Sequence, residues 1–170
     1  MFRVSIAVCV MLLPVAAAAD PSLNPDVRQD TLATTICSAG YTKAIRPASN
    51  YTSGIKIKLV QSMGEPDEAV ALYELDHIVP LALGGHPRSL DNLQLQAWDV
   101  ARRKDRIEVK MQCLVCSGQI ALADAQRQIV DDWQAAYHRW APVVCHRDKT
   151  DPNPWWRGLF DRVRWVVAGQ

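Results

Sequence analysis

Residues 75–96 read LDHIVPLALGGHPRSLDNLQLQ, and this stretch decides the fold that the sequence predicts. Asp76 and His77 stand in an apolar run with strand character over residues 72–79, which a Gly-Gly pair ends. The letters NLQLQ predict a second short strand after the loop. Burying a carboxylate and an imidazole in such a run costs free energy unless a metal, a hydrogen bond or a catalytic role compensates for that cost. The stretch therefore indicates two strands, a loop between them, and a candidate functional site on the first strand.

Two helices are predicted after the second strand. Apolar residues recur at helical spacing over residues 97–116, which end just before Gly118, and again over residues 122–140. A shorter helix is predicted earlier, at residues 53–63, where a Gly-Glu-Pro sequence stops it. Strand, loop, strand and helix in this order make a ββα unit, and the sequence contains no internal repeat.

The N-terminus has the pattern of a secretory signal peptide over residues 1–19. Arg3 precedes an apolar run that is too short to span a bilayer comfortably, and four alanines before Asp20 form a typical cleavage site. We therefore expect an exported chain, periplasmic or secreted, that is not stably inserted in a membrane. A retained membrane anchor is the alternative interpretation. The remaining chain is long enough for one compact domain with its own core.

The exported chain divides into three parts in this interpretation. Residues 20–33 are polar and are expected to be loose, residues 34–148 form the domain, and residues 149–170 form a Trp-rich tail that is expected to dock on it as an amphipathic helix. The whole sequence has 19 basic and 18 acidic residues, and the predicted signal peptide contains one of the basic ones. Because no net charge is then left, a nucleic-acid partner would have to be held by a local basic patch.

Cysteine usage agrees with export. The chain has five cysteines, and one of them, Cys9, lies in the predicted signal peptide. An even number in an exported chain predicts two disulfides, for which four cysteines allow three pairings. The four are Cys37, Cys113, Cys116 and Cys145. The CxxC sequence among them could instead be half of a zinc site or a redox pair, but the sequence contains no second CxxC, so disulfides are favoured.

The predicted ββα unit resembles the HNH, or ββα-metal, endonuclease family. The Asp-His pair, Asn92 and a helix with acidic and basic residues follow one another in the order of that family. ELDHIVPLALGG, DNLQLQ and ARRKDRIE look like its exported bacterial branch, as do TICSAGYTKAIRP upstream and CSGQIALADAQRQIVDDWQAAY downstream. The resemblance covers residues 34–137. It implies an α+β fold in which helices surround a ββα-metal (HNH or His-Me finger) core that is stapled by disulfides.

The same resemblance implies metal-dependent hydrolysis of phosphodiester bonds in DNA, with RNA as a second substrate class. His77 would be the general base, and Asn92 would brace the loop and hold His77 in position. Asp76 would bind a single divalent cation, for which Mg²⁺ is the expected ion and Mn²⁺ or Zn²⁺ the alternatives. A buried histidine with a purely structural role is the competing interpretation of His77.

The helix departs from the family's pattern at two positions. Ala101 stands where many members have a metal-binding His or Asn, and Arg102 stands where the branch often has a histidine. Asp105, one helical turn beyond Ala101, is the expected second ligand, with a solvated charge paired with Arg102 as the alternative. Glu108 is interpreted as a solvated charge paired with Lys104, with a ligand as the alternative. The departures also favour an alternative function, a non-catalytic scaffold of this family that binds nucleic acid or a protein partner.

A short basic patch lies on the same helix. Arg102, Arg103 and Lys104 are expected to contact the phosphates of a nucleic acid. An ordinary solvated helix face gives the same sequence pattern and is the competing interpretation.

The resemblance also implies a disulfide pairing. In the branch that this chain resembles, a cysteine in the TIC segment recurs together with a cysteine that corresponds to Cys116. This implies a bond between Cys37 and Cys116 and leaves Cys113 to pair with Cys145. A bond between Cys113 and Cys116 would instead require the helix to break there.

Overall fold

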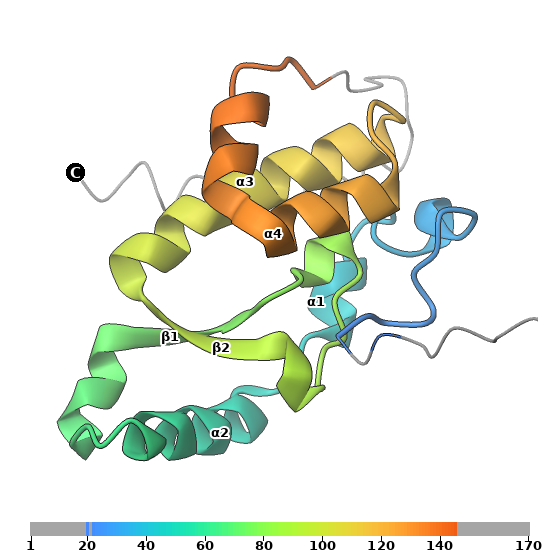
Figure 1. Cartoon of the computed structure of the whole chain (residues 1–170). Coiled ribbons are helices and arrows are strands. Elements are labelled where there is room, and N and C mark those ends of the chain that lie inside the picture. Colours follow the sequence, from blue (N-terminus) through green and yellow to red (C-terminus); the bar gives the residue numbers. More distant parts are fainter. Residues whose placement is uncertain (1–19, 21, 146–170) are drawn as a thin grey trace, which may run out of the picture.

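The computed structural model describes residues 20 and 22–145 (Figure 1). Its helices and strands are, in chain order, α1 (Tyr41–Ile45), α2 (Ser49–Ser62), β1 (Tyr73–His77), β2 (Leu93–Ala97), α3 (Trp98–Cys116) and α4 (Leu122–Trp140). Short 3-10 turns lie at Leu32–Thr34, Asp67–Leu72, Leu81–Leu83 and Leu90–Asn92. The predicted α+β class is confirmed. The predicted signal peptide (1–19) and the predicted Trp-rich tail (149–170) lie outside the described residues.

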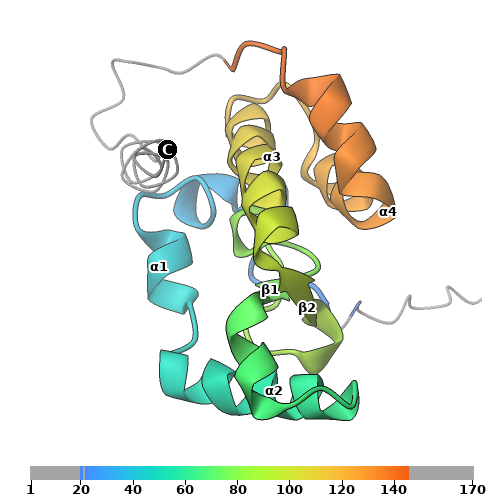
Figure 2. The same ribbon diagram turned by 90° about the vertical axis from the view of Figure 1, so that its left-hand side faces the viewer.

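The two strands form an antiparallel sheet that lies between α2 and α3 (Figures 1 and 2). The pairing ends where His77 lies opposite Leu93. Because side chains alternate along a strand, Glu74 and Asp76 share one face of the sheet. The chain leaves β1 at His77, enters the loop, returns along β2 and continues directly into α3, which is the predicted order of strand, loop, strand and helix.

Helix α3 presents one buried stripe to the rest of the domain. Ala101, Lys104, Ile107, Met111 and Leu114 follow the three- and four-residue spacing of a helix face, and all five are buried. α4 lies beside α3 and contributes to the same apolar core (Figure 2). The stripe is apolar except for the lysine, which therefore needs partners inside the protein.

Helix α2 begins at Ser49, earlier than the predicted start at residue 53. Its first turn is polar, and the hydroxyls of Thr52 and Ser53 donate to the carbonyl oxygen of Ser49 at 3.1 and 2.7 Å. A polar first turn shows no apolar periodicity, so the apolar pattern placed the start of the helix too late. The strands and the two long helices lie within two residues of their predicted limits.

The segment expected to be loose, residues 20–33, packs on the domain where it is described. Val27 is buried in the core, and the backbone N–H of Asn24 donates to the carbonyl oxygen of Gly84 at 2.9 Å. Leu23 also forms an isolated β-bridge with Gly85. The prediction was wrong because these contacts join residues far apart in the sequence, which a local polar composition does not reveal.

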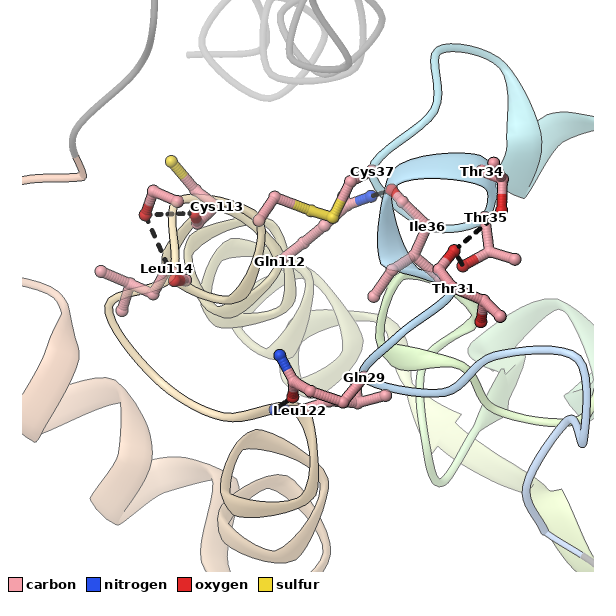
Figure 3. Close-up of a disulfide and its surroundings, with 12 residues drawn as sticks. Gln29, Thr31, Thr34, Thr35, Ile36, Cys37, Gln112, Cys113, Leu114 and Leu122 are labelled. Atoms are coloured by element: carbon pink, nitrogen blue, oxygen red, sulfur yellow. Dashed lines mark hydrogen bonds between the residues drawn. A yellow bond between two sulfur atoms is a disulfide. The ribbon is translucent and has the colours of Figure 1, made fainter.

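Both disulfides of the predicted pairing are present. Cys37 bonds Cys116 and Cys113 bonds Cys145, with Cα atoms 5.5 and 6.0 Å apart. The Cys37 bond joins the N-terminal segment to the end of α3, where Gln112 also donates to the carbonyl oxygen of Ile36 at 2.6 Å (Figure 3). The zinc or redox interpretation of the CxxC sequence is therefore wrong. Each bond restricts the unfolded chain and contributes about 2–4 kcal/mol.

The two disulfides are typical of proteins that fold in an oxidising compartment outside the cytosol. Within residues 20 and 22–145, no helix is both long and apolar enough to cross a membrane.

Candidate active site

The loop between β1 and β2 is held in shape by a buried asparagine and a pair of glycines. The side chain of Asn92 is fully buried; its Oδ1 accepts from the N–H of Val79 at 2.7 Å. Its Nδ2 donates to the carbonyl oxygens of Val79 at 3.0 Å and His86 at 3.1 Å. A Cβ atom on Gly85 would lie 1.8 Å from the carbonyl oxygen of Val79, so this position requires glycine. The side chain of Asn92 thus connects Val79 and His86 within the loop.

His77 is the last residue of β1 and only 7% exposed. Its Nε2 lies 3.2 Å from the carbonyl oxygen of Pro87. Because a carbonyl oxygen only accepts, this hydrogen bond requires the proton on Nε2, and Nδ1 then keeps a lone pair. Burial lowers the pKa of His77, helped by the charges of Arg46 and Lys104 and opposed by the Pro87 hydrogen bond and the Asp76 carboxylate. A neutral imidazole with a lone pair is the form that a general base needs.

Lys104 lies where α3 meets the end of β1, and it is 1% exposed. Its Nζ donates to Oδ2 of Asp76 at 2.8 Å, to the carbonyl oxygen of His77 at 2.8 Å and to Oε1 of Glu108 at 2.5 Å. Burial alone would lower the pKa of Lys104, but the carboxylates of Glu108 and Asp76 outweigh it and raise the pKa above its usual value. The amine is therefore a permanent internal cation at neutral pH.

This geometry corrects two expectations. The predicted pairing of Lys104 with Glu108 is present, but it is buried rather than solvated. The predicted contact of Lys104 with nucleic-acid phosphates is wrong, because the amine is enclosed by the protein. The physical reason is the position of the lysine on the buried stripe of α3, one turn before Ile107.

Four carboxylates influence one another beside this lysine. Burial is the main cause that raises the pKa of Glu74 and of Glu108, each to about 7. The charges of Asp105 and Asp76 raise both pKa values further, whereas Lys104 opposes the rise. Residues of β1 and of α3 thus form one acidic cluster at the junction of the sheet with the helix.

The donor atoms of this cluster suit a hard divalent cation. Mg²⁺ prefers carboxylate oxygens and is often held by one or two of them, with water and substrate phosphate completing its coordination. Asp76 and Asp105 therefore fit the ion in the type of ligand that they offer. Among residues 20 and 22–145, no three His, Cys, Asp or Glu side chains are arranged to hold a metal ion together. Most of the coordination would thus come from water and substrate.

Two of the three basic residues predicted to contact phosphates are exposed, and the third, Lys104, is buried. Arg102 and Arg103 lie on the solvent side of the helix, and Arg103 pairs with Asp99 at 3.4 Å, one turn earlier. Ala101, at the position where the family pattern has a ligand, is buried in the stripe. The predicted patch thus retains two exposed arginines, of the three basic residues expected.

Sequence reasoning missed Glu74 and Arg46. Glu74 stands two residues before Asp76, so strand periodicity alone was enough to place both carboxylates on one face. Arg46 lies just before α2, yet its charge acts on both Glu74 and His77. That relationship depends on how α2 lies against the sheet, and no local pattern predicts it.

Comparison of the chain with protein-family models, curated proteins and solved structures found no match. The geometry at the end of β1 and the residue pattern around it therefore carry the functional argument.

Proposed function

We propose that the protein is a metal-dependent endonuclease of the HNH type, which hydrolyses phosphodiester bonds of DNA. The observation that carries the proposal is His77, a buried histidine with a lowered pKa, whose ring is oriented by the carbonyl oxygen of Pro87. It stands beside Asp76 at the end of a strand that a loop, a second strand and a helix follow. The residue pattern of this unit resembles the HNH family, and RNA is a second substrate to be tested.

In this proposal, Nδ1 of His77 accepts a proton from the attacking water while Nε2 stays bonded to Pro87. Asn92 keeps the loop that carries Pro87 in place through its three hydrogen bonds. Asp76 and Asp105 would hold one divalent cation, expected to be Mg²⁺, which when bound would stabilise the negative charge that develops on the phosphate.

The remaining parts of the proposal concern substrate attraction and location. Arg102 and Arg103 supply the local positive charge that a nearly neutral chain needs to hold a polyanion. We place the activity in the periplasm or outside the cell, because the chain has two disulfides and its N-terminal sequence resembles a signal peptide.

The test is incubation of the purified protein with supercoiled plasmid DNA and, separately, with RNA. Mg²⁺, Mn²⁺ and Zn²⁺ are each added alone, and a chelator is added in a parallel series. We expect nicked and linear DNA with Mg²⁺, and no cleavage with the chelator. Lack of cleavage with all three ions would contradict the proposal.

A non-catalytic scaffold is the second candidate, and one specific observation favours it. The ammonium of Lys104 already neutralises Asp76, the carboxylate expected to bind the cation, and Ala101 offers no ligand. Such a protein would bind DNA with a salt-dependent affinity and leave it intact with every ion. A gel-shift assay beside the plasmid assay separates the two candidates.

A further inference from the structure

We propose that Lys104 is a positioning residue for the general base, an inference that rests on the proposed function. Its ammonium connects the Asp76 carboxylate and the His77 backbone to α3, the helix that also carries Asp105. Lys104 thereby holds the base and the expected cation ligands in one fixed relationship, without contacting the substrate.

His77 is held at two points, and Lys104 provides one of them. The ring is held through Nε2 by the carbonyl oxygen of Pro87, at 3.2 Å. The backbone is held through its own carbonyl oxygen by the ammonium of Lys104, at 2.8 Å. Since ring and backbone are both fixed, Nδ1 can point in only one direction. Removing the ammonium frees the peptide at which the strand becomes the loop.

Stability alone does not explain a lysine at this position. Lys104 occupies a position in the otherwise apolar buried stripe of α3, and a buried ion pair often stabilises a protein no more than well-packed apolar side chains do. The ammonium uses its three N–H donors on three acceptors, so it is fully hydrogen-bonded. Two of those acceptors belong to Asp76 and His77, consecutive residues of the proposed site, and the third is its counter-ion Glu108.

A direct role in substrate binding does not fit the burial of this residue. Only 1% of Lys104 is exposed, so a phosphate cannot reach the ammonium without a rearrangement of α3 and β1. Its loss should therefore change the rate of the chemical step and leave the affinity for DNA unchanged. That split between kcat and KM distinguishes positioning from substrate contact.

The experiment uses Lys104→Met and the charge-balanced double variant Lys104→Met/Glu108→Gln. The double variant removes the cation together with its counter-charge, in case the single variant does not fold. Lys110→Met is the matched control, because Lys110 also lies on α3 and its amine donates to a backbone carbonyl, that of Val143, at 2.7 Å. Near-UV circular dichroism checks the fold of each variant.

We expect kcat to fall about 100-fold in both Lys104 variants with KM for DNA unchanged, the size of effect that a misplacement of about 1 Å produces. Lys110→Met should retain the parent's kcat. A folded Lys104 variant with the parent's kcat would overturn the proposal, and so would one in which only KM rises. If neither variant folds, the role of Lys104 is structural and the proposal is likewise wrong.

A second measurement does not depend on cleavage. The ¹⁵N signals of the His77 ring should show a proton fixed on Nε2 in the parent, and a mixture of tautomers in the Lys104 variants. If the parent does not cleave nucleic acid at all, the proposed function fails, and the ring signals alone decide the positioning role. Identical ring signals in parent and variants would overturn it.

Discussion

Nε2 of His77 lies 3.2 Å from the carbonyl oxygen of Pro87, and this contact joins the end of β1 to the loop that Asn92 braces. Asn92 fixes the residue before Pro87, because its side-chain amide donates to the carbonyl oxygen of His86 at 3.1 Å. The ring of His77 is thus oriented by loop backbone that is itself fixed from the inside. The proposed base is held by the architecture of the loop, and changes in that loop should affect cleavage.

Gly85→Ala tests the close packing of the loop. The added Cβ would lie 1.8 Å from the carbonyl oxygen of Val79 and 2.7 Å from Nδ2 of Asn92. Neither neighbour can move without breaking the hydrogen bonds of Asn92, so we expect a loss of about 1–3 kcal/mol or more in the free energy of unfolding. Urea unfolding measures the loss, and cleavage should fall with it.

Gly54→Ala is the matched control for that substitution. Gly54 lies inside α2, and a Cβ there would meet no atom within 4 Å. Alanine has a higher helix propensity than glycine, so the free energy of unfolding of this variant should rise by about 0.5–1 kcal/mol. Equal effects of the two substitutions would contradict the account of the loop.

Glu74→Gln tests the acidic cluster through the pH dependence of stability. The pKa of Glu74 is raised from 4.5 to about 7 in the folded protein, mainly by burial. Between about pH 4.5 and 7 the folded chain therefore keeps a proton that the unfolded chain releases, and the stability from this group is lost as the pH rises from about 4.5 to about 7. Glutamine resembles the protonated form, so the free energy of unfolding of the variant should match that of the parent at about pH 4 and exceed it at about pH 8.

The measurement is the urea midpoint of parent and variant at both pH values. Glu65→Gln, at an exposed position after α2, shows the effect of removing a carboxyl group from the surface. A difference between parent and Glu74→Gln that stays constant with pH would show that Glu74 does not titrate in this range.

The strands, the two long helices and the residues of the loop could be predicted because their signals are local. Strand character over a few residues placed the strands, apolar spacing placed α3 and α4, and the glycine pair marked the loop. The disulfide pairing came from the resemblance and not from spacing. The pairing of His77 with Leu93 joins the two ends of the loop, and it thereby brings Asp76 and His77 close to Asn92.

The position of Lys104 could not be predicted from the basic sequence around it. ARRKDR has the composition of a solvated helix face, and composition does not tell which residue points inward. The spacing of the apolar residues does show that Lys104 points inward, because it lies three residues before Ile107 and seven before Met111 on the same helix face. The role of Arg46 and the packing of Val27 depend on contacts distant in sequence, which periodicity cannot predict.

Asp105→Asn tests the expected second ligand of the cation. Loss of one carboxylate should raise the Mg²⁺ concentration needed for half-maximal cleavage by about 10-fold or more. Asp99→Asn is the control, because Asp99 is an exposed carboxylate of the same helix that pairs with Arg103. If Asp105→Asn keeps the Mg²⁺ dependence of the parent, Asp105 is not a ligand.

The cleavage rate of His77→Ala tests most directly the central claim that His77 is the general base. We compare initial nicking rates of supercoiled plasmid with Mg²⁺ for the parent, for His77→Ala and for His138→Ala, an exposed histidine of α4. Loss of a general base costs about 10²–10⁴ in rate, so His77→Ala should be slower by that factor while His138→Ala keeps the parent's rate. A folded His77→Ala protein that nicks the plasmid as fast as the parent would contradict the account.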